Sequence, residues 1–89
     1  MGRRTELRDV LDAEMRRWSS MSFEQLMSEL EDVRAYETEV ESKRYQIEVQ
    51  LLEKTDAYVH VLVSVMDGSF LTFIVPLIGS FICKKEGPL

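Results

Sequence analysis

The sequence predicts an α+β fold in which two amino-terminal helices pack on one face of a four- or five-stranded antiparallel meander. Three observations predict it. Apolar residues recur every three or four positions in the first third, they recur every second position afterwards, and turn residues separate the alternating segments. Eighty-nine residues suffice for one domain. We therefore expect a single domain over 1–89, with a helical part at 1–33, a sheet at 34–85 and a tail at 86–89.

The first helix is predicted from Thr5 to Ser19. Its apolar residues fall on one face at a spacing of 3.6 residues per turn, opposite a charged face. Thr5 is the expected amino-terminal cap, because its hydroxyl can accept a hydrogen bond from a backbone amide of the first turn. The apolar face consists of Leu7, Val10, Leu11, Met15 and Trp18.

The second helix is predicted to start directly after Ser22. Gln25 follows Ser22 at the spacing of a capping box, in which each side chain accepts a hydrogen bond from the other residue's backbone amide. Met21 and Leu26 have the spacing of a hydrophobic staple across the same boundary. We therefore expect two short helices joined by a serine-rich corner.

Two alternating segments, YETEVES and RYQIEVQLL, predict the first pair of strands. A two-residue turn at positions 42–43 would pair Val40 with Tyr45 and set Glu41 opposite Arg44. This register brings apolar side chains together on one face and opposite charges together on the other. Ser-Lys is not a favoured pair for a type I′ turn, so the turn type stays open.

The third strand is predicted after a turn at Lys54–Asp56. Four valines alternate with other residues along it, and β-branched side chains favour strands over helices. We expect the valine face to be buried beneath the helices. The four residues are Val59, Val61, Val63 and Val65.

The stretch from Ser64 to Phe81 is the least polar part of the chain, and it contains Asp67 and Gly68. A membrane-spanning helix does not fit, because Asp67 would lie near its middle and the apolar run after it is shorter than the roughly 20 residues that a span needs. Asp-Gly is a favoured pair in two-residue hairpin turns. We therefore predict a hairpin and a fourth strand, which Pro76 places at an edge or bends.

The register of this fourth strand stays open, because the strand is apolar on both faces. A two-residue turn places Val65 opposite Phe70 and Val61 opposite Ile74. The segment SFICKK can resume as a short final strand. A three-residue turn shifts the pairing by one position and directs a different set inward, namely Leu71, Phe73 and Val75.

The outer face of the sheet is predicted to be half apolar on its third and fourth strands. A small sheet with such a face usually has a partner, most often a second copy of the same chain. We expect a homodimer through this surface. The expected interface residues on the third strand are Tyr58, His60, Leu62 and Met66.

The middle of the chain is acidic. Residues 24–53 carry nine Asp or Glu against three Arg or Lys, a net charge of −6, and the whole chain carries −5. Nucleic acid and anionic membranes both require basic surfaces, so we expect neither as a partner. An alternative function is a chaperone-like, antitoxin-like or immunity-like protein that binds a basic protein. The acidic face would consist of Glu37, Glu39, Glu41 and Glu48.

The sequence predicts no catalytic, cofactor-binding or metal-binding residues. Its single histidine, His60, and single cysteine, Cys83, are expected to lie apart along the sheet, and no phosphate loop, zinc spacing or hydrolase motif occurs. A lone cysteine and the lack of a secretory pattern indicate the cytoplasm. A second alternative function is a ligand or enzyme pocket between the helices and the sheet, lined by Trp18 and methionines.

Four short segments resemble a loose group of small bacterial proteins to which no activity is assigned. These proteins have an SFEQL-like helix start, a Y-x-I-x-V strand, an Asp-Gly hairpin and an SFI segment. The resemblance implies a helical part followed by a meander, and it implies no particular reaction. The corresponding segments here are Ser22–Leu26, Tyr45–Val49, Met66–Ser69 and Ser80–Ile82.

Overall fold

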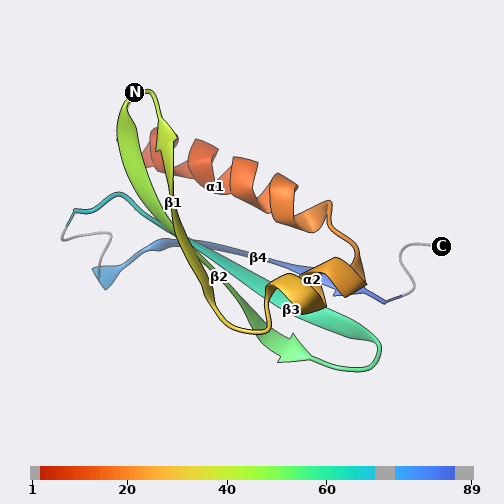
Figure 1. Cartoon of the computed structure of the whole chain (residues 1–89). Coiled ribbons are helices and arrows are strands. Elements are labelled where there is room, and N and C mark those ends of the chain that lie inside the picture. The colour runs from red at the N-terminus through yellow and green to blue at the C-terminus, as the bar shows by residue number, and fades with distance from the viewer. Residues whose placement is uncertain (1–2, 70–73, 86–89) are drawn as a thin grey trace.

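The computed structural model describes residues 3–69 and 74–85. The strands form one antiparallel sheet in the order β1-β2-β3-β4, and both helices lie on the same side of it (Figure 1). The predicted α+β fold is confirmed, with four strands in the described part of the chain. The elements are α1 (Arg3–Ser19), α2 (Phe23–Glu29), β1 (Arg34–Val40), β2 (Lys43–Lys54), β3 (Tyr58–Met66) and β4 (Leu77–Lys84).

The two helices begin differently from each other. Helix α1 already includes Arg3, so Thr5 lies inside the helix and the prediction that it is the cap is wrong. Helix α2 has the predicted capping box: the Gln25 amide donates to Ser22 Oγ at 3.1 Å, and the Ser22 amide donates to Gln25 Oε1 at 3.3 Å. Because these bonds satisfy amides that the first turn would leave unpaired, they fix where this seven-residue helix starts.

The core lies between the helices and one face of the sheet. The four valines of β3 have no solvent-exposed surface, as the alternation predicts. Each side chain of this size contributes roughly 1.5–3 kcal/mol when it is fully buried, so β3 is the centre of stability. Trp18 and Leu26 bring α1 and α2 into the same core. The remaining core residues are Leu7, Val10, Leu11, Leu30, Tyr45, Ile47 and Val49.

The β1–β2 hairpin turns at Glu41 and Ser42, one position earlier than predicted. Both residues have positive φ, 51° and 72°, as the two central residues of a type I′ turn require. Val40 therefore pairs with Lys43, and Tyr45 pairs with Thr38. The predicted pairing of Val40 with Tyr45 is wrong by two residues along the strand. A shift of two preserves the faces, which explains why the apolar pattern alone did not reveal it.

A β-bulge interrupts β2 near its end. The pairing with β3 skips from Leu51 to Glu53, so Leu52 is the extra residue. The bulge reverses the alternation, and Lys54 consequently pairs with Val59 on the side of the sheet that faces the helices. The following turn is held by Thr55, whose Oγ1 accepts from the amides of residues 57 and 58 at 3.1 and 3.0 Å.

Strand β4 starts later than the predicted hairpin allows. Val65 pairs with Leu77, so Asp67 and Gly68 do not form a two-residue turn between strands and that prediction is wrong. Asp67 Oδ1 accepts from the Ser69 amide at 2.9 Å, which makes the pair the beginning of a longer connection. Pro76 directly precedes β4 and is one reason for the late start, because proline cannot donate to a ladder.

Of the residues predicted to pair with β3 as a fourth strand, some are described by the structure and some are not. Ile74 and Val75 are exposed and precede β4. Neither predicted register is correct, because a segment that is apolar on both faces does not specify its pairing. Four residues of the predicted strand lie outside the described residues: Phe70, Leu71, Thr72 and Phe73.

Gly79 allows helix α1 to lie directly on β4. A Cβ atom at this position would be 3.1 Å from Met15 Sδ and 3.4 Å from both Leu11 δ carbons. A side chain at this position would require Met15 and Leu11 to shift by a few tenths of an ångström. The glycine therefore suits the close contact between α1 and β4.

Candidate functional site

The face of the sheet opposite the helices is apolar on its β3 and β4 half. Ile78 and Ile82 on β4 are 51% and 58% exposed; of the predicted interface residues of β3, His60 pairs with Ile82 and Leu62 pairs with Ser80 between the two isoleucines. Sequence reasoning missed both isoleucines because it started the fourth strand too early. The alternation in LIGSFICK was the signal that could have found them. We call this surface the outer apolar patch: Tyr58, His60, Leu62, Met66, Ile78 and Ile82.

The other half of the same face is charged. Glu37 and Glu39 on β1 and Glu48 on β2 are exposed there, while Glu41 lies in the hairpin turn. Arg44 pairs across the strands with Glu39 and forms an ion pair with Glu37 at 3.5 Å. The predicted acidic face therefore exists for three of its four residues, and one arginine partly neutralises it.

His60 and Cys83 do not form a thiol–imidazole pair. Cys83 pairs with Val59 and faces the helices, whereas His60 pairs with Ile82 and faces outward. The expectation that they lie far apart along the sheet is wrong, because they are diagonal neighbours. Their separation comes from the pleat, which directs successive side chains to opposite faces.

A buried polar cluster joins α1 to β1. Trp18 Nε1 donates to the Tyr36 hydroxyl at 2.8 Å, and this hydroxyl donates to the Glu14 carboxylate. Arg17 lies 3.7 Å from Glu14 and within 6 Å of the Trp18 and Tyr36 ring centroids, at 5.7 and 5.5 Å. Sequence reasoning missed Glu14 and Tyr36. Glu14 does lie four residues before Trp18, on the apolar stripe of α1.

The chemistry of this cluster is that of a structural contact. Burial, followed by the hydrogen bond to Glu14, raises the pKa of Tyr36 to about 12. The hydroxyl therefore keeps its proton at neutral pH, whereas a general base or nucleophile needs a pKa near the working pH. The cluster therefore orients β1 against α1 through hydrogen bonds that join the two elements.

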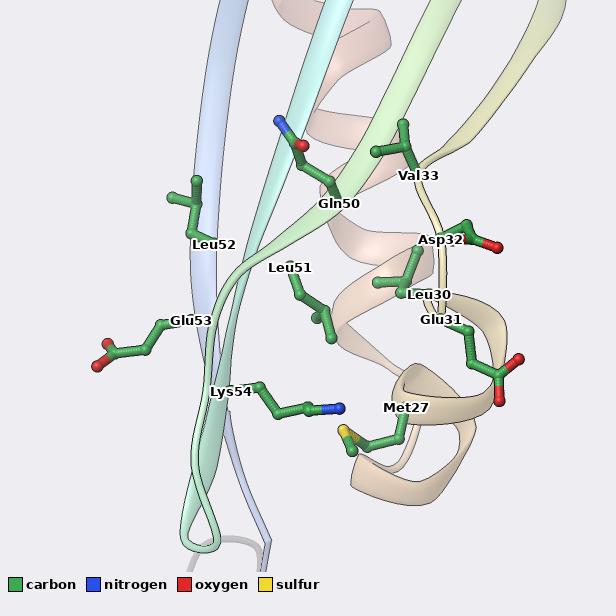
Figure 2. A pocket seen from close by; sticks show the side chains of 10 residues that line it. All are labelled: Met27, Leu30, Glu31, Asp32, Val33, Gln50, Leu51, Leu52, Glu53 and Lys54. Carbon is green, nitrogen blue, oxygen red and sulfur yellow. The ribbon is translucent and has the colours of Figure 1, made fainter.

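A pocket of about 450 Å³ opens between α2, the segment that joins it to β1, and the end of β2. Its floor is apolar, with Leu30 and Leu51 facing each other, and the β2 bulge directs Lys54 toward Met27 across it (Figure 2). Lys54 has no ion pair among the described residues. Trp18, expected to line such a pocket, is enclosed in the core instead. The other lining residues are Glu31, Asp32, Val33, Gln50, Leu52 and Glu53.

Within 3–69 and 74–85, no three His, Cys, Asp or Glu side chains are close enough together to hold a metal ion. In the same part of the chain, neither helix has the length and apolar character needed to cross a membrane. Comparison with protein-family models, with curated proteins and with solved structures found no match to this chain.

Proposed function

We propose that this protein is a small non-enzymatic interaction module of the cytoplasm that self-associates through the β3–β4 part of its sheet. The observation that carries the proposal is the contrast between the two faces of that part. One face is closed by helices, and the other exposes Ile78 and Ile82 beside Leu62. Exposed apolar side chains that gather on one surface favour association, because burying them removes apolar area from water.

Size-exclusion chromatography with light scattering tests this proposal. The chain has a mass of 10.4 kDa, and we expect twice that mass at micromolar concentration. Ile82→Lys should shift the protein toward the monomer, since a charge in the centre of an interface must be desolvated. Val33→Lys is the matched control, because Val33 is 51% exposed but lies outside the sheet. A monomeric native protein would contradict the proposal.

The pocket beside α2 supports a second candidate function, the binding of a small molecule with an apolar body and an anionic group. Met27, Leu30 and Leu51 would contact the apolar body, and the Lys54 amine would pair with the anion. The carboxylates of Glu31 and Asp32 turn away from the pocket, and the Leu52 and Glu53 side chains also point away from it, although both residues contribute to its lining (Figure 2).

Titration with decanoate, followed by NMR, tests this second candidate. We expect shifts at Met27 and Leu51 and about tenfold weaker binding in Lys54→Gln, the typical effect of losing a charged hydrogen bond. Lys84→Gln, which removes an exposed lysine on β4, should leave the binding unchanged. Binding that is indifferent to Lys54→Gln, or no binding at all, would exclude this use of the pocket.

A further inference from the structure

Among the residues that the structure describes, no strand pairs with the outer edge of β4, so one row of its backbone hydrogen-bonding groups is not used within the sheet. The Lys85 amide donates to the Ala57 carbonyl at 2.8 Å, directly beyond the pairs Lys84–Tyr58 and Cys83–Val59. In an antiparallel ladder, hydrogen-bonded pairs recur at every second residue. The odd-numbered residues of β4 therefore bond to β3. The even-numbered residues direct their N–H and C=O groups to the free edge: Ile78, Ser80, Ile82 and Lys84.

Apart from Lys84 at its last position, this edge lacks the features that prevent strands from pairing. Proteins protect exposed edges with charges, prolines or bulges, and β1 at the opposite edge carries Glu37 and Glu39. Strand β4 carries no charged residue from Leu77 to Cys83. The only nearby proline, Pro76, comes before the strand begins.

The outward residues from Ile78 to Ile82 have the same order, isoleucine, serine, isoleucine, in both chain directions. Ile78 and Ile82 flank Ser80 symmetrically, and a twofold contact requires that kind of self-complementarity. We propose, building on the self-association proposed above, that β4 pairs antiparallel with β4 of a second copy, with Ser80 opposite Ser80 and Ile78 opposite Ile82. Three hydrogen-bonded pairs would add about six backbone hydrogen bonds and create a continuous eight-stranded sheet.

Charge also favours this arrangement over a contact between two outer faces. The acidic β1 and β2 strands would lie toward the two far ends of the joined sheet. The two β2 strands would be five strand spacings apart, about 24 Å, which exceeds the Debye length of about 8 Å. Antiparallel pairing also keeps the two Lys84 side chains roughly 27 Å apart along the strands, whereas parallel pairing would bring them together.

Inside the joined sheet, the pairing sets Phe81 of one copy opposite Gly79 of the other. On the outer face, the patches of the two copies become one surface around the twofold axis. There, Ile78 of each copy lies beside Ile82 of the other, so the second copy completes each apolar patch and removes part of its surface from water.

Ser80→Pro tests the strand pairing directly. The Ser80 amide points away from β3, so proline is tolerated by the monomer fold but blocks the edge. We expect Ser80→Pro to be a folded monomer and Ser80→Ala, the control, to remain a dimer. If Ser80→Pro is still a dimer, the edge pairing is wrong while the proposed self-association stands. If the native protein is a monomer, both are wrong.

Amide hydrogen exchange of the native full-length chain gives an independent answer, including the case in which Ser80→Pro does not fold. In the paired state, the Ser80 and Ile82 amides should exchange as slowly as Phe81, although they point away from β3. Fast exchange at Ser80 and Ile82, beside slow exchange at Phe81, would overturn the edge pairing.

Discussion

The two outer strands of the sheet are attached to the helices by different kinds of contact. Strand β1 is held by polar side chains. The Tyr36 hydroxyl hydrogen-bonds to Trp18 and Glu14 on α1. The Arg34 guanidinium donates to the carboxylate of Glu29, the last residue of α2, at 2.7 Å. Strand β4 is held by apolar packing under α1, where Gly79 permits close approach. The outward side chains of β1 include Glu37 and Glu39, whereas those of β4 are uncharged except for Lys84 at its last position.

This difference suggests a division of roles between the two edges. Directional bonds and surface charges fix β1 in one position and make it unsuitable for further pairing. Apolar packing against α1 holds the inner face of β4 but leaves its outer edge free in the part of the chain that the structure describes. One end of the sheet is therefore closed by its own side chains, and the other is available to a second chain.

The largest effect is expected from Trp18→Ala, which breaks the attachment of β1. Trp18 is 1% exposed, and truncating a buried tryptophan costs about 3–5 kcal/mol of unfolding free energy. Urea denaturation measures the loss. Val33→Ala, at an exposed position, should change the free energy by less than about 0.5 kcal/mol. A similar loss in the two variants would show that β1 does not depend on Trp18.

Tyr36→Phe should have the next largest effect, because it removes only the hydroxyl. The buried Trp18 N–H and the Glu14 carboxylate then lose their partner, at a cost of about 1–3 kcal/mol. Denaturation at neutral pH measures it. Retained stability would mean that the two groups find other partners and that the ring alone positions β1.

The pH dependence of the native protein separates the hydroxyl's contribution from that of the ring. The pKa of Tyr36 is about 12 in the folded state and about 10 in an unfolded chain. Because the folded pKa is the higher, its contribution is complete below pH 10 and is lost as the pH rises toward 12. Tyr45 and Tyr58 also have raised pKa values, so the test compares the native protein with Tyr36→Phe across this window.

Gly79→Ala is expected to destabilise the β4 side by about 1 kcal/mol, because the new methyl group would press on Met15 and Leu11. The double variant Met15→Ala, Gly79→Ala separates two effects of the new methyl group: its crowding against Met15 and its restriction of the backbone of the unfolded chain. Without the Met15 sulfur, alanine at position 79 should be neutral or stabilising, since it restricts the unfolded chain. Equal effects in both backgrounds would show that α1 is not limited by Met15.

The fold was predictable from sequence where the pattern of residues had one solution. The valine alternation of β3 allowed only one buried face, and the Ser22–Gln25 pair allowed only one helix start. Turns were less predictable. Glu41 and Ser42 adopt positive φ although neither is glycine, and the Asp67–Gly68 pair begins a long connection instead of a tight turn. In both cases the pairing of whole strands outweighed local turn preference.

The candidate site was predictable only in part, for related reasons. The residues on β3 followed from alternation, but Ile78 and Ile82 depended on a register that an apolar strand does not specify. The inward turn of Lys54 depends on a bulge at Leu52, and nothing in the local sequence signals it. Glu14 was not identified as a buried residue, because glutamate is rarely buried unless it is paired and its partner Tyr36 is distant in the chain.

The smallest effect is expected from Lys43→Met, which removes the ion pair with Glu6 at 2.9 Å beside the β1–β2 turn. Both side chains are about half exposed, so solvent screens the pair; the loss should be small and should shrink further in high salt. The hydrogen bond and charge of Lys43 lower the pKa of Glu6, so the contribution is present above the unfolded pKa and is lost as the pH falls through the folded pKa. Arg44→Met, which loses a longer 3.5 Å contact with Glu37, is the control and should have a smaller effect.

If Lys43→Met instead destabilised the protein as much as Tyr36→Phe, the charges near β1 would be structural attachments in their own right. A small, salt-sensitive loss would indicate that these charges mainly keep this edge from pairing, the property that β4 lacks.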